Sequence, residues 1–124
     1  MLQAYSLNAE VAADGIIPFN NVAIDKGCAE SLSGVGTVEL NKCGVYRVTV
    51  DGTASAATTV QISKNGTPLP YAQATGTHIA FDTFIQVDKN NCQCNVCSSP
   101  VTIQVLNSAA VTFTNVNITV DKVA

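Results

Sequence analysis

The sequence predicts an all-β fold, an antiparallel β-sandwich of jelly-roll type. Apolar and polar residues alternate with a period of two along most of the chain. The alternating segments are short and are separated by turn-forming residues. No stretch has convincing helical periodicity over eleven residues. With 124 residues, the chain is long enough for one domain, residues 1–124, with a core of its own.

The first strand is expected in YSLNAEV, residues 5–11. One face would carry Tyr5, Leu7, Ala9 and Val11, and the other Ser6, Asn8 and Glu10. The N-terminal stretch MLQAYSLNAEVAADG, residues 1–15, has no basic region and no unbroken apolar stretch, so it is not interpreted as a signal peptide. We therefore expect synthesis in the cytoplasm without signal-peptide export.

The later strands follow from the same alternation. Their inward-facing residues would be Val38 and Leu40; Tyr46, Val48 and Val50; Val60 and Ile62; Ile79, Phe81, Ile85 and Val87; Val101, Ile103 and Val105; and Val116, Ile118 and Val120. The core is expected to contain Tyr46, Val48, Val50, Val60, Ile62, Ile85, Val87, Val101, Ile103, Val105 and Ile118.

The connections carry turn chemistry. KNGTP at 64–68 places Asn-Gly between two strand patterns and predicts a type I′ hairpin. LNSAAV at 106–111 predicts a second tight connection. AADGIIP at 12–18 and IDKGCAESLSGVG at 24–36 are expected to be longer loops.

Composition excludes several function classes. Hydrophobic residues make up 47% of the chain and charged residues 12%, which argues against disorder. The net charge is −3 and Lys and Arg are not clustered, so neither nucleic acid nor an anionic membrane is an expected partner. No apolar run approaches the roughly 20 residues that span a bilayer.

No catalytic constellation is apparent. His78 is the only histidine, and no nucleophile or spaced carboxylate pair lies near it in sequence. The acidic residues Asp14, Asp25, Asp82 and Asp88 lack the spacing of a calcium loop. We expect no enzyme activity and no cofactor.

The cysteines are the one unusual feature. NCQCNVCSSP at 91–100 contains Cys92, Cys94 and Cys97, and Cys28 and Cys43 lie elsewhere in the chain. Three thiolates with this spacing could bind zinc, with Cys28, Cys43 or a symmetry mate as the fourth ligand. Disulfides, for example from Cys28 or Cys43 to the cluster, are the preferred interpretation, and reduced thiols are the third. Since five is an odd number, at least one thiol must stay free, bind metal or pair between chains.

Several segments together resemble a known family. CGVYRVTVDGTASA at 43–56 resembles the Gly-x-Tyr-x-hydrophobic strand of tumour-necrosis-factor-like jelly rolls, the fold shared with complement globular heads. VQISKNGTPLPYA at 60–72, GIIPFNNV at 15–22 and NITVDKVA at 117–124 resemble the head domain of the collagen-like spore-surface glycoprotein of bacilli. The chain has no Gly-X-Y stalk, and it has a Cys-rich loop where the spore protein has a polar connection.

The resemblance implies a TNF-like jelly roll that forms a homotrimer, and it supplies no catalytic residues. Stand-alone heads of this kind are similar to bacteriophage proteins that decorate capsids or tip fibres. Apolar residues expected on outer faces, Val45, Phe84, Leu106 and Phe113, would suit a threefold interface.

We therefore expect a structural protein on the virion surface, in contact with capsid or fibre proteins. The strand at 1–10 is a candidate anchor to such a partner. The alternatives are a spore-surface head, or a binding module whose loops at 71–78 and 89–99 recognise a host-surface glycan or protein.

Overall fold

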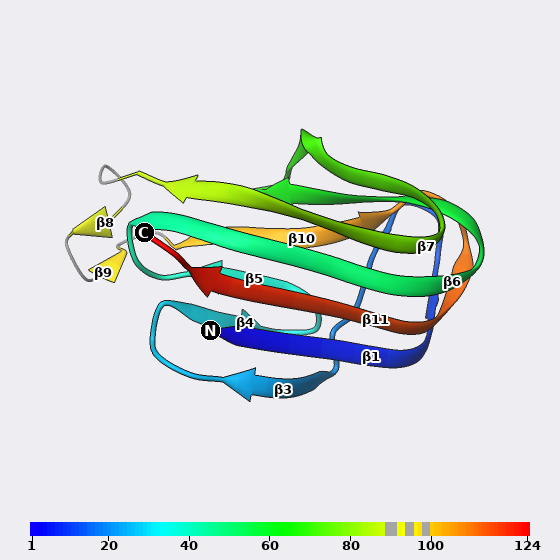
Figure 1. The fold of residues 1–124 in the computed structure, drawn as a ribbon, viewed down its shortest axis with the longest axis horizontal. Coiled ribbons are helices and arrows are strands. Elements are labelled where there is room, and N and C mark those ends of the chain that lie inside the picture. Colours follow the sequence, from blue (N-terminus) through cyan, green and yellow to red (C-terminus); the bar gives the residue numbers. More distant parts are fainter. Residues whose placement is uncertain (89–91, 94–95, 98–99) are drawn as a thin grey trace.

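The computed structural model describes residues 1–88, 92–93, 96–97 and 100–124, and confirms the all-β antiparallel fold. The strands are β1 (Leu2–Val11), β2 (Gly15–Ile16), β3 (Asn21–Asp25), β4 (Glu30–Ser33), β5 (Thr37–Leu40), β6 (Gly44–Lys64), β7 (Thr67–Val87), β8 (Cys92–Gln93), β9 (Val96–Cys97), β10 (Val101–Asn107) and β11 (Val111–Lys122). Figure 1 shows β1, β11, β6 and β7 running side by side along the length of the domain.

The long strands β6 and β7 take part in both layers of the sandwich. The first half of β6 pairs with β11 and with the second half of β7, which gives a first sheet in the order β3-β1-β11-β6-β7. The second half of β6 pairs with β10 and with the first half of β7, which gives a second sheet in the order β4-β5-β10-β6-β7. Inner faces of the two sheets enclose the core, as in other sandwiches.

The predicted core is confirmed. All eleven expected residues are at most 2% exposed: Tyr46, Val48, Val50, Val60, Ile62, Ile85, Val87, Val101, Ile103, Val105 and Ile118. Alternation succeeds here because each of these residues lies on a strand with one face inside and one outside.

The predicted faces of the first strand are wrong over its first half. Ser6 is buried, as are Leu2 and Ala4, whereas Leu7 is exposed. The inner side changes at Asn8, which has a φ of 52°, so that Ala9 is buried next. The inner side of β11 changes at the same level of the sheet. Phe113, which pairs with Ala9, is buried, and Asn115, which pairs with Leu7, is exposed. The expectation that Phe113 faces outward is therefore also wrong.

Two segments that were expected to be loops contain core structure. Residues 12–18 include β2, and Ile17 is fully buried with its N–H donating to Val105 O at 2.8 Å. Residues 24–36 include β4, which pairs with β5. The buried Ser6 hydroxyl donates to Pro18 O at 2.7 Å, which holds the extended segment after β2 against β1.

The Asn65-Gly66 turn is the predicted type I′ hairpin. Both residues have positive φ, 51° and 84°, as this turn requires. The Asn65 side chain also fixes the neighbouring strand, because its Oδ1 accepts from Thr102 N at 2.9 Å. Residues 71–78 were expected to form an exposed loop, but they belong to β7, and this expectation is wrong.

Alanine at Gly36 should destabilise the fold more than alanine at Gly34. Both glycines lie in the β4–β5 turn with positive φ. A Cβ at Gly36 would lie 2.6 Å from Ile17 O, whereas one at Gly34 would meet no atom within 4 Å. We expect a loss of about 2–3 kcal/mol for Gly36→Ala against about 1 kcal/mol for Gly34→Ala, measured by chemical denaturation. Equal losses would show that crowding against Ile17 does not matter.

Candidate functional site

Two of the five cysteines lie at the end of the sandwich where the chain termini meet. Cys28 lies between β3 and β4, and Cys43 immediately precedes β6. Both line one pocket of about 340 Å³, and neither forms a disulfide within the described residues. Lysines and acidic residues surround them: Lys26, Glu30, Lys42, Asp121 and Lys122.

The Cys-rich segment leaves and rejoins the sandwich at this same end. Val87, the last residue of β7, pairs with Gly44, and Val101, the first of β10, pairs with Leu40. Within the segment, the backbones of Cys92 and Cys97 are opposite each other in the β8–β9 pair. Cys94 and the side chains of residues 89–99 lie outside the described part of the structure. The choice between disulfide, metal and free thiol therefore stays a prediction.

A buried carboxylate in this pocket was not anticipated. The Glu30 side chain is 1% exposed, and its Oε1 lies 2.8 Å from the Met1 ammonium. The same ammonium also donates to Lys26 O at 2.6 Å. Neither Glu30 oxygen has a hydrogen-bond partner within the described residues, so its contact with Met1 is an ion pair without hydrogen-bond geometry. The sequence does indicate a strand at Glu30. Leu32 and Val38 lie on either side of two glycines, Gly34 and Gly36, and this pattern is typical of a hairpin.

Tyr46 lies in the core at the same end of the sandwich and bonds to the connections there. Its hydroxyl donates to Lys42 O at 2.7 Å, with Ala29 O a second acceptor at 3.3 Å, and accepts from Lys42 N at 3.2 Å. Burial raises the pKa of Tyr46 above its ordinary value of 10.0, and electrostatic interactions with Glu30 and Cys43 add to the increase. The Lys42 hydrogen bond acts in the opposite direction. The phenol is therefore a neutral structural group that joins two connections.

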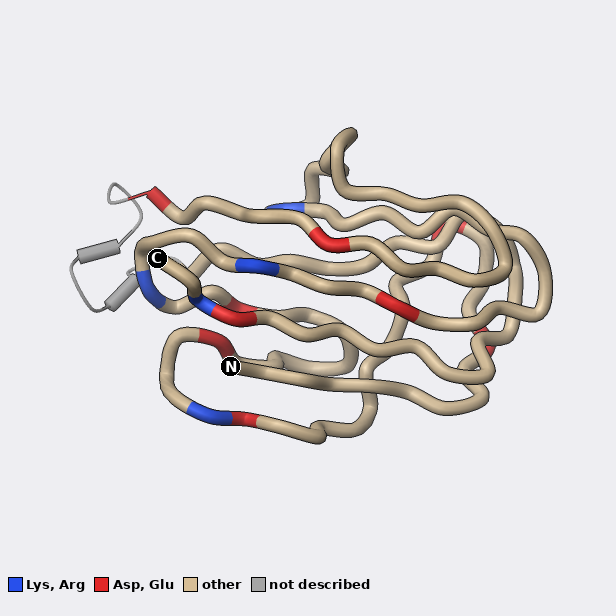
Figure 2. Tube along the Cα trace, viewed as in Figure 1, with Lys and Arg blue, Asp and Glu red and all other residues tan. Residues whose placement is uncertain are grey.

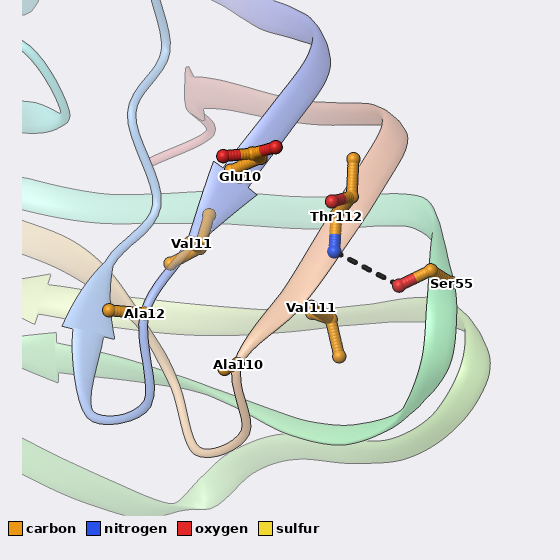
Figure 3. A pocket seen from close by; sticks show the side chains of 7 residues that line it. All are labelled: Glu10, Val11, Ala12, Ser55, Ala110, Val111 and Thr112. Atoms are coloured by element: carbon orange, nitrogen blue, oxygen red, sulfur yellow. Dashed lines mark hydrogen bonds between the residues drawn. The ribbon is translucent and has the colours of Figure 1, made fainter.

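The far end of the sandwich has an open depression of about 500 Å³, shown in Figure 3. It lies between the end of β1, the start of β11 and the bend of β6. The Thr112 N–H donates to the Ser55 hydroxyl at 3.0 Å across it. The other side chains that line it are Glu10, Val11, Ala12, Ala110 and Val111. This depression has one carboxylate and no neighbouring nucleophile–base pair among its lining residues.

The other polar residues considered from the sequence are dispersed. His78 is exposed, and its Nδ1 lies 3.5 Å from Thr53 Oγ1. Asp82 forms an exposed ion pair with Arg47, 2.8 Å between Oδ2 and a guanidinium nitrogen. Figure 2 shows the acidic residues spread over both ends and the middle of the molecule. Across the described residues, no three His, Cys, Asp or Glu side chains come together as a metal site.

The comparisons with known proteins identify the fold. No known protein family matches the sequence, and no curated protein does so either. The structure is similar to rabbit GITRL, with a TM-score of 0.64, 9% identity, and 100% and 95% of the two chains covered. It is similar to the globular domain of zebrafish complement 1qA protein, with a TM-score of 0.63, 7% identity, and 99% and 96% covered. Pika GITRL has a TM-score of 0.58, 11% identity and full coverage of both chains.

The protein thus has a jelly-roll domain of the type found in TNF ligands and complement C1q heads. The described residues include no helix long and apolar enough to cross a bilayer.

Proposed function

We propose that the protein is a homotrimeric head domain with a structural role on the surface of a bacteriophage particle. Its task would depend on shape and stability rather than on catalysis. The observation that carries the proposal is the outer face of the first sheet, where the exposed apolar side chains of Leu7 and Phe84 lie among polar and charged residues.

That face is built by the outward residues of β1, β11, β6 and β7. Leu7 is 61% exposed and Phe84 is 59% exposed, and Tyr5 and Val45 are half-buried beside them. The outward residues Asn115, Asn117 and Thr119 of β11 are uncharged, whereas Phe84 lies beside Arg47, which pairs with Asp82 and lies opposite Asp121. Leu106, expected to belong to the same surface, lies on the outer face of the second sheet instead.

A threefold contact between copies of this face would remove Leu7 and Phe84 from water. Large apolar side chains that share one face of a small protein usually mark an interaction surface, and most soluble homo-oligomers have closed symmetry. The TNF-like fold supports an oligomer of three chains, because the resemblance found in the sequence implies trimers. The same resemblance supports a phage particle as the location.

Sedimentation equilibrium tests the assembly. We expect a species of three times the 12.9 kDa of one chain, and Phe84→Lys should convert it to monomer at micromolar concentration. Val35→Lys is the matched control, because Val35 is 65% exposed in the β4–β5 turn, away from the face. A monomeric wild-type protein, or a Phe84→Lys variant that stays trimeric, would contradict the proposal.

The location needs its own experiment. An antibody against the folded domain should label intact phage particles in electron microscopy. The protein should also co-purify with these particles. Recovery of all the protein in the particle-free fraction would contradict the virion role and would leave the trimer intact.

A further inference from the structure

A rigid protrusion interrupts β7 on the second sheet. Gln61 of β6 pairs with Gln73 of β7, and Ser63 pairs with Pro68. The two paired positions are therefore two residues apart on β6 but five residues apart on β7. The additional residues of β7 leave the plane of the sheet and form the projection at the top of Figure 1. Tyr71 lies in this projection and is 64% exposed.

Hydrogen bonds and prolines hold the protrusion in place. Gln61 Nε2 donates to Leu69 O at 2.9 Å, and Gln73 Nε2 donates to Pro70 O at 3.2 Å. Leu69 packs against the core, and Ala72 is fully buried. Tyr71 is therefore presented on a backbone that has little freedom left to lose on binding.

A groove of about 250 Å³ adjoins the base of the protrusion. Pro68 and Leu106 provide apolar surface, and Gln61 links the groove to the protrusion. Asp14 also lines the groove and is exposed. The remaining lining residues are Thr59, Asn107 and Ser108.

We propose that this groove and Tyr71 bind a neutral saccharide. A pyranose ring has one face of C–H groups, which packs on an aromatic ring or on apolar side chains, and a rim of hydroxyls, which donate to carboxylates and amides. Leu106 and Pro68 in the groove, with Tyr71 on the adjoining protrusion, supply the first kind of surface, and Asp14 and Gln61 supply acceptors for the second. Pockets of this kind combine apolar surface with a few oriented polar groups.

Charge selects the class of saccharide. No Lys or Arg is among the residues that line the groove, and Asp14 is acidic. A sialylated, sulfated or phosphorylated ligand would bring a negative charge beside Asp14 with no basic partner. The site is independent of the trimer, because it lies on the second sheet and the proposed trimer face lies on the first.

An array of neutral and acidic oligosaccharides, probed with the labelled full-length protein, tests the site. We expect neutral hexose or N-acetylhexosamine oligosaccharides to bind, and we expect the strongest of these to bind in solution by titration calorimetry. Tyr71→Ala should weaken that binding by roughly tenfold or more, as loss of an aromatic anchor does. Tyr71→Phe should retain it, because the ring face is kept.

Two further variants separate binding from folding. Asp14→Asn removes the charge at a residue with a φ of 59°, which asparagine tolerates, and should weaken binding without unfolding the protein. Val22→Ala, at an exposed position of β3, should leave binding unchanged. No neutral glycan bound by the wild-type protein, binding only of acidic glycans, or unchanged binding by Tyr71→Ala would overturn the proposal. Sedimentation of the same samples shows whether the assembly is unaffected.

Discussion

Tyr46→Ala is expected to cost about 3–5 kcal/mol of unfolding free energy, the range for removing a large aromatic side chain from a core. Tyr46 is fully buried, and its hydroxyl is hydrogen-bonded to the connections before β4 and before β6. The substitution therefore opens a cavity and also leaves backbone groups of Lys42 without a partner. Chemical denaturation at a fixed protein concentration measures the loss.

Tyr46→Phe separates the hydroxyl from the ring. We expect it to cost about 1–3 kcal/mol, because Lys42 N and Lys42 O lose their partner while the packing is kept. It should also change the alkaline limit of stability. The raised pKa of Tyr46 keeps the phenol neutral in the folded state after it ionises in the unfolded chain, so wild-type stability falls as pH rises above about 10. A Tyr46→Phe variant with the same fall above this pH would show that Tyr46 does not cause it.

Asn107→Leu is expected to cost a similar amount, about 3–5 kcal/mol, since more than one buried polar group loses its partner. Asn107 is fully buried at the end of β10. Its Oδ1 accepts from the Thr58 hydroxyl and its Nδ2 donates to Ala109 O, so one side chain joins β6 to the β10–β11 turn.

The matched control is Asn20→Leu, at an exposed position. That change should alter the unfolding free energy by less than about 0.5 kcal/mol. An Asn107→Leu protein as stable as the wild type would contradict this prediction. A double-mutant cycle with Thr58→Val should return a coupling energy of at least about 1 kcal/mol.

The inward residues of β6 from Tyr46 to Ile62, and those of β10, were predictable because they stay on one side of the strand. Val48 and Val50 on β6, and Val101 and Ile103 on β10, follow the alternation without interruption. The pattern failed at Asn8, because a single residue with positive φ changes the inner side and alternation on either side of it looks regular. Nothing in the apolar pattern alone marks such a residue.

The candidate sites depend on tertiary contacts between distant residues, which a single sequence does not reveal. Glu30 is charged and lies near two glycines, so it was assigned to a loop, although the fold buries it beside Tyr46. Asp14 and Gln61 are far apart in the chain and meet only because β2 and β6 both lie next to β10. The trimer and virion interpretations came from the resemblance and not from any single pattern of residues.

The pairing of β1 with β11 has a consequence for how the chain reaches this structure. Leu2 pairs with Val120, so the strand at the start of this domain pairs with the strand at its end. The β6–β7 hairpin can form much earlier, because its strands are joined by a two-residue turn. Pairings between distant segments make folding slow. Until β11 is available, the edge of β1 that faces it stays unpaired, and β3 is the strand that lies beside β1. The domain is therefore prone to aggregate as long as β11 is missing.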